Sequence, residues 1–174
     1  MDKELVLRAK KRDKDAFVEL INQQKESMYK IAKTILKKEE DVADAMQDTI
    51  LNCWEKINTL RKPEYFRTWM VRILINNCNA IYRQRSKVVL NNEIILEETV
   101  DADYFNVEWQ EMMSYLNEKQ RIVVELYYVE QFKVREIADI LQIGQSAVKG
   151  RLQAARKIIE ANYCTDTQRG SVFG

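Results

Sequence analysis

The side chains of this chain best suited to binding another molecule are basic, and they gather in two stretches. Residues 61–87 hold seven basic side chains and a single acid, Glu64. Residues 145–157 hold Lys149, Arg151, Arg156 and Lys157 and no acid. Local basic clusters indicate nucleic-acid binding better than the overall charge, which is only +1. The alternative is that these side chains simply solvate the outer faces of helices.

Residue types that commonly carry catalysis or bind metals are scarce. The chain has no histidine, and its three cysteines, Cys53, Cys78 and Cys164, lie far apart without forming a CxxC pair. This pattern disfavours a zinc site, and the sequence contains no P-loop or nucleophile motif. We therefore predict no catalytic residue, no metal, no cofactor and no small-molecule substrate, and a protein that is not an enzyme. The cysteines are expected to be small buried hydrophobic residues in a reducing compartment.

The sharpest local pattern is VREIADILQIGQSAVKGRLQAARKII, residues 134–159. Two helical periods separated by Leu141-Gln142-Ile143-Gly144 predict a helix-turn-helix. Gly144 can cap the second helix, and Gln142 is expected to adopt a left-handed backbone conformation at a cost of about 1 kcal/mol. An ordinary helical hairpin is the alternative. The predicted inward positions are Ile137, Ala138 and Leu141 on the first helix and Val148, Leu152, Ala155 and Ile159 on the second.

The outward face of the second helix carries side chains that can read DNA in the major groove. Arginine and lysine bond guanine edges, glutamine pairs with adenine, and serine is versatile. We predict DNA contact by Ser146, Lys149, Arg151, Gln153 and Arg156, with Gln145 on the same face.

The elements that must position these residues are predicted to be helices. Apolar residues recur at helical spacing around residues 17–21, 28–35 and 42–57, and three acids after Lys38 favour a helix start. Pro63 marks a break before a helix over residues 64–85. The predicted apolar stripe of that helix is Phe66, Trp69, Ile73, Asn76 and Ala80. A further helix is expected to start near Asn117, with a break at residues 131–133.

Composition favours an all-α fold. Four glycines and one proline in 174 residues allow few turns, and 46% hydrophobic with 32% charged residues argue against a membrane or disordered protein. No apolar run approaches the roughly 20 residues that span a bilayer. The charged residues 1–4 precede no signal-peptide core, so we expect a cytoplasmic protein.

Residues 87–105 divide the chain into two small helical domains. This stretch holds one lysine and five acids, whereas residues 1–86 hold 18 basic and 13 acidic side chains and residues 106–174 hold nine of each. We predict domains over 1–86 and 106–163, joined by the linker 87–105. The Gly, Ser and Thr content of residues 164–174 predicts a disordered tail.

Four strings, taken in order, resemble the extracytoplasmic-function (ECF, group 4) branch of the sigma-70 family of RNA polymerase sigma factors. Three of them resemble region 2: DKDAFVELINQQKESMYKIAKTIL, EEDVADAMQDTILNCWEKI and FRTWMVRILINNCNAIYRQR. The fourth, LNEKQRIVVELYYVEQFKVREIADILQIGQSAVKGRLQAARKII, resembles region 4, which reads the −35 promoter element. The resemblance spans residues 1–160, and four strings in this order are far more specific than any one alone.

The resemblance implies which residues meet which partner. Asp44, Gln47, Asp48 and Trp54 match the helix that grips core RNA polymerase, although Trp54 can equally be a core residue. Opening the −10 element requires an unstacked base to be held. Leu60, Arg61, Lys62, Asn76, Arg83 and Arg85 match this −10 contact, the last two as phosphate ligands.

Three side chains in region 2 have a second interpretation. Asn76 can read a base edge or cap a loop inside the core, and base reading is the favoured role. Phe66 and Trp69 can stack on bases, but their spacing favours packing between helices.

The implied function is that of an alternative sigma factor. Such a protein binds core RNA polymerase and promoter DNA, and an anti-sigma factor, commonly anchored in the membrane, holds it in an envelope-stress response. The rival is a stand-alone helix-turn-helix regulator that binds an operator as a dimer without polymerase. The strings of the first half argue against this rival.

Overall fold

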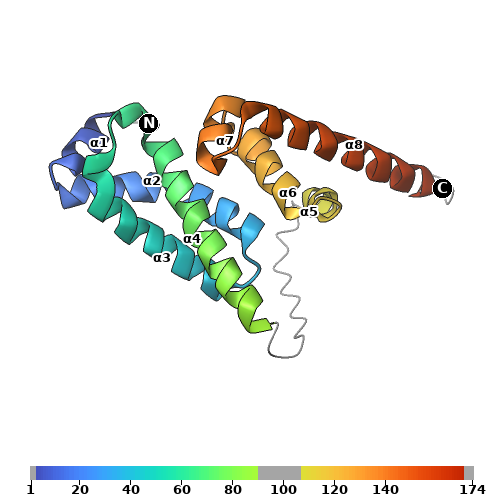
Figure 1. The fold of residues 1–174 in the computed structure, drawn as a ribbon, viewed down its shortest axis with the longest axis horizontal. Coiled ribbons are helices and arrows are strands. Elements are labelled where there is room, and N and C mark those ends of the chain that lie inside the picture. The colour runs from blue at the N-terminus through green and yellow to red at the C-terminus, as the bar shows by residue number, and fades with distance from the viewer. Residues whose placement is uncertain (1–2, 90–106, 171–174) are drawn as a thin grey trace. The chain divides into compact units, whose positions relative to one another are not determined.

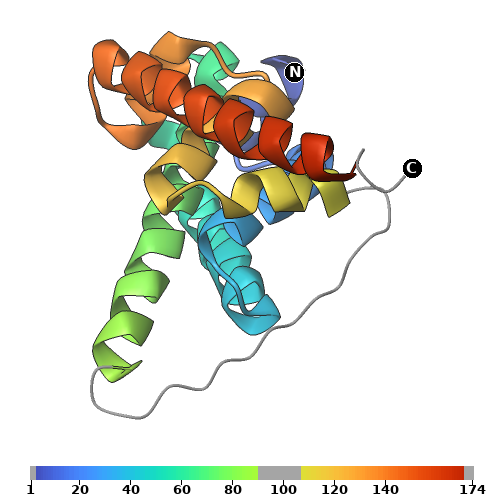
Figure 2. The ribbon, with the colours of Figure 1, turned by 90° about the vertical axis from the view of Figure 1, so that its right-hand side faces the viewer.

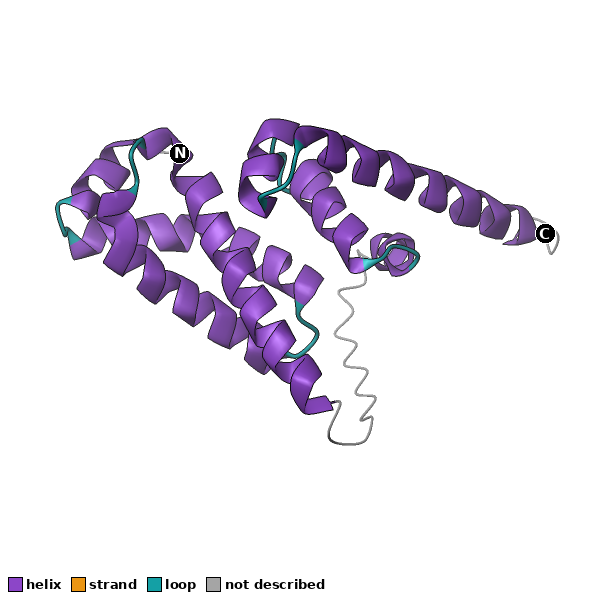
Figure 3. Ribbon diagram, in the orientation of Figure 1, coloured by secondary structure: helices purple, strands orange, loops and turns teal. Residues whose placement is uncertain are grey.

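The computed structural model describes residues 3–89 and 107–170, and every regular element in those ranges is a helix (Figures 1 and 3). The chain divides into two compact units, residues 1–97 with 139–141 and residues 98–138 with 142–174. The prediction of an all-α fold with two small helical domains is confirmed. The linker predicted over residues 87–105 lies almost wholly outside the described residues.

The first unit is a bundle of four α-helices. They are α1 (Lys3–Lys10), α2 (Lys14–Ile35), α3 (Glu39–Lys56) and α4 (Phe66–Val89), and two short 3-10 turns, η1 (Ile57–Thr59) and η2 (Pro63–Tyr65), join α3 to α4. Helix α2 packs against α1, α3 and α4, and α3 packs along α4 (Figures 1 and 2). The expected start of α3 after Lys38 is confirmed, whereas α1 had not been predicted as a helix.

The core of the first unit follows the apolar spacing of α2. Phe17, Leu20, Ile21, Met28 and Ile31 are all buried on its inner face, as their helical spacing predicted. Asp13 caps the start of this helix by accepting a hydrogen bond from the Ala16 amide at 3.1 Å. Burial of such side chains stabilises the fold by about 1.5–3 kcal/mol each.

The apolar stripe predicted for α4 was wrong except at Phe66. Trp69 and Ile73 are only half-buried, and Asn76 and Ala80 are exposed. The predicted stripe and the stripe that is actually buried both have helical spacing, so periodicity alone does not show which of two neighbouring faces of α4 is buried. The face that is buried contains apolar residues only: Phe66, Met70, Val71, Leu74, Ile75 and Cys78.

The second unit contains the predicted helix-turn-helix. Its elements are α5 (Val107–Ser114), α6 (Glu118–Val124), the π-helical turn η4 (Glu125–Val129), α7 (Val134–Leu141) and α8 (Gln145–Gly170). Asn117 and Gln120 form the capping box that starts α6, which confirms the expected helix start. Ile137, Ala138, Val148, Leu152 and Ala155 are buried as predicted, while Leu141 and Ile159 are half-buried.

Helix α8 continues to Gly170 (Figure 2). Helix α8 therefore includes residues 164–170 of the segment predicted to be a disordered tail. Of the Gly, Ser and Thr residues that motivated that prediction, Thr165, Thr167 and Gly170 lie within α8, and residues 164–169 contain neither glycine nor proline to stop a helix. Residues 171–174 lie outside the described residues.

Candidate functional site

The turn between α7 and α8 fixes the direction of the second helix. Gln142 has φ 56° and ψ 44°, which is the left-handed conformation expected from the sequence. The amides of Gln142 and Ile143 both donate to the Ala138 carbonyl, the latter at 3.1 Å. Gly144 stands at the cap of α8, and its carbonyl accepts from the Val148 amide at 3.2 Å. The start of α8 is thereby held at the corner of the helix-turn-helix.

The exposed face of α8 begins with Ser146 and continues through Lys149 and Gln153, all three of them exposed. Lys157 is exposed as well, and at four residues beyond Gln153 it lies on the same side of the helix. The sequence placed Lys157 in the basic cluster without assigning it a contact. Helical spacing from Ser146 through Gln153 to Lys157 could have identified it.

Arg151 does not share this face. It is half-buried, and it lies two residues from both Lys149 and Gln153, which turns it by roughly 200° around the helix. Alternation at every second residue would place side chains on one face of a strand, not of a helix. The prediction that Arg151 points outward with Lys149 and Gln153 was therefore wrong.

Arg156 is exposed but already bound within the second unit. Its Nε donates to the Tyr128 Oη at 2.6 Å, and its guanidinium lies 5.7 Å from the centre of the Tyr128 ring. The hydrogen bond to Tyr128 raises the pKa of Arg156, so the side chain stays charged. The sequence analysis did not identify Tyr128, which lies on η4 and binds Arg156 at the edge of the basic face of α8.

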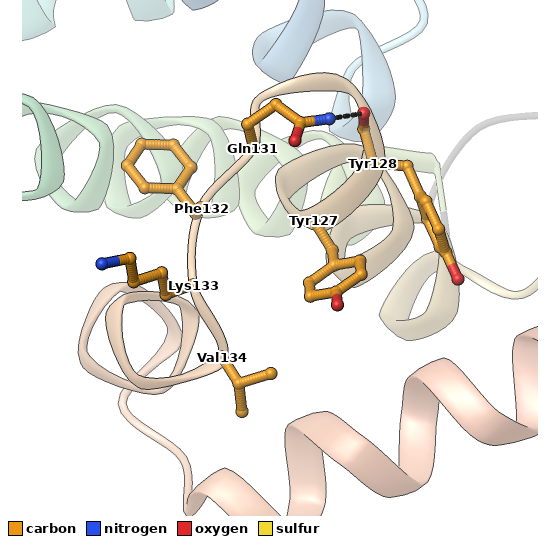
Figure 4. Close-up of a pocket in the computed structure, with 6 residues that line it drawn as sticks. All are labelled: Tyr127, Tyr128, Gln131, Phe132, Lys133 and Val134. Atoms are coloured by element: carbon orange, nitrogen blue, oxygen red, sulfur yellow. Dashed lines mark hydrogen bonds between the residues drawn. The ribbon is translucent and has the colours of Figure 1, made fainter.

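A small hollow of about 380 Å³ lies beside this edge, between η4 and the start of α7 (Figure 4). Gln131, which has φ 59°, closes the turn by donating its amide to the Tyr128 carbonyl at 2.6 Å. Tyr127 and Tyr128 meet edge to face at 5.0 Å. The hollow thus results from a tight turn that holds two tyrosines in place.

The connection between α3 and α4 presents Arg61 and Lys62 to solvent, as its predicted role in DNA contact requires. Leu60 is only 4% exposed and packs in the core, so its assignment as a −10 contact is corrected. Tyr65 is 48% exposed, and the Lys62 ammonium lies 6.0 Å from its ring centre. Tyr65 is an exposed aromatic residue that sequence reasoning overlooked.

Two neighbouring asparagines on α4 have separate roles. Asn76 is exposed and does not cap a loop inside the core. Asn77 is the amide that reaches inward, donating to the Thr49 Oγ1 at 3.0 Å, while Thr49 donates to the Ala45 carbonyl at 2.6 Å. This pair of bonds ties α4 to α3 and leaves Asn76 available at the surface.

The two arginines near the end of α4 also differ. Arg83 is exposed, and its Nε donates to the Asn79 carbonyl of its own helix at 3.1 Å. Arg85 donates through Nε and Nη2 to the Asp41 Oδ1, at 3.1 and 2.6 Å. Asp41 is 6% exposed, so this ion pair links α3 to α4. The Arg85 side chain nevertheless stays 52% exposed, so its assignment to a DNA phosphate remains a prediction.

The outer face of α3 carries Asp44, Gln47 and Asp48, all exposed. Trp54 is half-buried, with its ring 5.0 Å from that of Phe17 and beneath the guanidinium of Arg12 at 5.2 Å. Trp54 therefore packs against Phe17 and Arg12. Part of its ring remains accessible.

A groove of about 830 Å³ runs between α2 and α3 beside this acidic face. Its floor includes the apolar side chains of Met46, Ile50 and Leu51, of which Leu51 is 55% exposed. Gln47 lines the same groove. An apolar strip bordered by carboxylates suits a partner that is apolar along its centre and basic at its edge.

Among the described residues, no cluster of cysteine and acidic side chains is arranged to hold a metal ion. Within the same ranges, no helix has the length and apolar character needed to cross a bilayer. Cys53 and Cys78 are buried, as predicted, and Cys164 lies where side chains are not described.

Two family models match the chain. Sigma-70 region 2 matches residues 20–88, and Sigma-70, region 4 matches residues 106–159. Among curated relatives, the RNA polymerase sigma factor SigV of Bacillus subtilis (strain 168) is 26% identical over 88% of this chain and 94% of its own length. The ECF RNA polymerase sigma factor SigW of the same organism is 24% identical over 91% of this chain and 95% of its own.

A solved structure shares the fold. The sigma factor RpoE, crystallised with the anti-sigma factor NepR from Bartonella quintana, aligns with a TM-score of 0.73 at 21% identity. The alignment covers 83% of this chain and 94% of that one. At this identity the likeness concerns the fold.

Proposed function

We propose a role in transcription initiation for this chain, which belongs to the sigma-70 family of RNA polymerase sigma factors and to its ECF branch. The chain binds core RNA polymerase and directs it to specific promoters, and it catalyses nothing itself. One observation carries the proposal. A single chain contains two units in succession. The first is a region 2 bundle with an exposed acidic helix face, and the second is a region 4 helix-turn-helix with an exposed basic helix face.

The −35 element is read by α8. Ser146, Lys149 and Gln153 lie on one exposed face, with Lys157 continuing it. Ser146 and Gln153 can bond base edges, and the lysines can bond either guanine or phosphate. Arg156, held by Tyr128, supplies a fixed positive charge at the edge of that face. Arg151 contacts DNA only if it leaves its half-buried position.

The −10 element is opened and held by the first unit. Arg61 and Lys62 supply charge on the connection between α3 and α4, Tyr65 supplies a ring on which a base can stack, and Asn76 supplies an amide for a base edge. Arg83 is placed at the far end of α4 to hold a phosphate. Leu60 supports this surface from the core. Arg85, which is exposed and paired with Asp41, can hold a second phosphate.

Core polymerase docks on α3. Asp44 and Asp48 accept bonds from basic residues of the partner, while the groove beside Gln47 receives its apolar side chains. Trp54 anchors one end of this contact with the part of its ring that Phe17 leaves accessible. The two DNA-binding units then act as linked weak binders, and polymerase sets the distance between the elements that they read.

Control by an anti-sigma factor is part of the proposal, as is a cytoplasmic location for the free protein. The structural neighbour from Bartonella quintana was captured with its anti-sigma factor, which supports a partner of that class here. A membrane-anchored anti-sigma factor would hold the chain at the membrane until an envelope signal releases it.

Gel filtration with and without core RNA polymerase tests this function. The proposal expects a monomer alone and co-elution with core polymerase when both are present. A dimer that binds DNA and ignores core polymerase would instead identify a stand-alone regulator.

A further inference from the structure

The helix α1 and the corner after it touch the connection between α3 and α4. Helix α1 contacts both η1 and η2, the turns on either side of Leu60–Lys62 (Figure 1). The match to sigma-70 region 2 begins only at residue 20, so α1 lies outside it. The contacts of α1 are therefore additional to those that define the matched region.

Two cations from this corner bind backbone carbonyls at the connection. The Lys10 Nζ donates to the Leu60 carbonyl at 2.6 Å. The Arg12 Nη1 donates to the Trp54 carbonyl at 2.6 Å, and its Nη2 lies 3.4 Å from the Glu55 carbonyl. The last carbonyls of a helix have no partner within the helix and favour positive charge. Arg12 thus closes the end of α3, and Lys10 holds the backbone six residues further on.

The corner that carries these cations is held by local bonds around a left-handed residue. Arg12 has φ 67°, a left-handed conformation that costs free energy in a residue with a side chain. The Arg8 Nη2 and Asp13 Oδ2 form an ion pair at 2.7 Å, and the Asp13 amide donates to the Arg8 carbonyl at 3.2 Å. A strained residue held in place by its surroundings is typical of functional positions.

We propose that Lys10 and Arg12 are positioning residues for promoter opening. They fix the backbone of residues 54–60 so that Arg61, Lys62 and Tyr65 stand where an unstacked base must be held. Neither cation touches DNA in this arrangement. The inference rests on the proposed function of the α3–α4 connection, and it assigns a role to a helix outside the matched region.

The test uses the full chain assembled with core polymerase, in the variants Lys10→Met, Arg12→Met and Lys10→Arg. Lys11→Met is the matched control, because Lys11 is an exposed neighbour of equal charge that makes none of these carbonyl bonds. Promoter opening is followed by permanganate reactivity of −10 thymines on duplex DNA. Activity on a template already unpaired at −10 is followed by run-off transcription. Core affinity is measured in parallel.

Lys10→Met and Arg12→Met are expected to reduce opening of duplex DNA about tenfold, which corresponds to about 1.4 kcal/mol. The core affinity of Lys10→Met, and the activity of both variants on the unpaired template, should stay within twofold of the wild type. Lys10→Arg, which keeps a donor, should restore most of the opening, and Lys11→Met should behave as wild type. Unchanged opening, or an equal fall in core affinity and opening, would overturn the positioning role.

Hydrogen exchange of the free chain separates this inference from the proposed function. Lys10→Met should speed exchange of the Leu60 amide, which donates to the Ile57 carbonyl at 3.2 Å, several-fold more than exchange within α2. Unchanged exchange would contradict the positioning role even where polymerase binding succeeds. A wild-type chain that ignores polymerase would instead remove the proposed function, while the exchange result would still decide whether Lys10 holds the connection.

Discussion

At the scale of single residues, burial decides the chemistry of the described cysteines. Removal from water raises the pKa of Cys53 and of Cys78 from 9.0 to about 12. Thiolate is the reactive form, so burial lowers the reactivity of both thiols in the folded chain near neutral pH. Because folding raises both pKa values, the folded chain holds the thiol protons more tightly than the unfolded chain does. The part of the free energy of unfolding that depends on this difference is present in full below about pH 9 and is lost as the pH rises toward 12.

Thiol titration checks this directly in a Cys164→Ser variant, which leaves the two buried cysteines alone. We expect no reaction with Ellman's reagent at pH 8 in the folded state and release of both thiols in guanidinium chloride. A fast reaction of either thiol in the folded protein would show that burial does not protect it.

Charge on the outer face of α3 is expected to govern polymerase binding. Asp44→Lys and Asp48→Lys should each weaken core affinity at least tenfold in a fluorescence anisotropy titration, because basic partner residues would then meet like charge. Both positions are exposed, so the free energy of unfolding should change by less than about 0.5 kcal/mol. Glu19→Lys on the exposed face of α2 is the control and should bind normally. Unchanged affinity in both aspartate variants would remove this face from the polymerase contact.

Single positions could be predicted from sequence where local geometry decides them. The left-handed Gln142 and the cap at Gly144 follow from the turn between two helical periods, and both are found. Leu60 was misplaced, and the partners of Arg85 and Arg156 were missed, because contacts between residues distant in the sequence decide the surroundings of these side chains. The nearest of those partners, Tyr128, is 28 residues from Arg156, and Asp41 is 44 residues from Arg85.

At the scale of elements, the ion pair between Arg85 and Asp41 joins α4 to α3. Arg85→Met should lower the free energy of unfolding by about 1–3 kcal/mol in urea denaturation, because it leaves a buried carboxylate without its partner. Arg83→Met is the matched control, since the hydrogen bond of Arg83 goes to the Asn79 carbonyl of its own helix, and it should cost less than about 0.5 kcal/mol. Equal losses in the two variants would mean that the pair contributes nothing specific.

Periodicity predicted the existence of most helices but not which face each one buries. On α2 the apolar residues form a single stripe, and the predicted face is the buried one. On α4 two stripes have helical spacing, and the purely apolar one is buried. Asn76 therefore lies at the surface, while the half-buried Asn77 bonds Thr49 on α3. Helix α1 was missed because it is only eight residues long and half of them are charged, and because its position depends on contacts with α2 and with the α3–α4 connection.

At the scale of the whole molecule, the two units are expected to divide the promoter between them. Lys149→Ala should weaken recognition of the −35 element about tenfold and leave opening at −10 nearly unchanged, because its side chain lies on α8 alone. Lys62→Ala should show the reverse pattern. Footprinting for the first element and permanganate reactivity for the second distinguish the two effects. Equal losses at both elements in either variant would contradict the division.

The most direct test of the central claim is transcription in vitro from a genomic DNA library by core RNA polymerase supplied with the purified chain. The account predicts new transcripts that start at a fixed distance downstream of two shared elements, separated by constant spacing. Omitting the chain should abolish them. No transcript beyond those of core polymerase alone, from a chain that is folded and pure, would contradict the account.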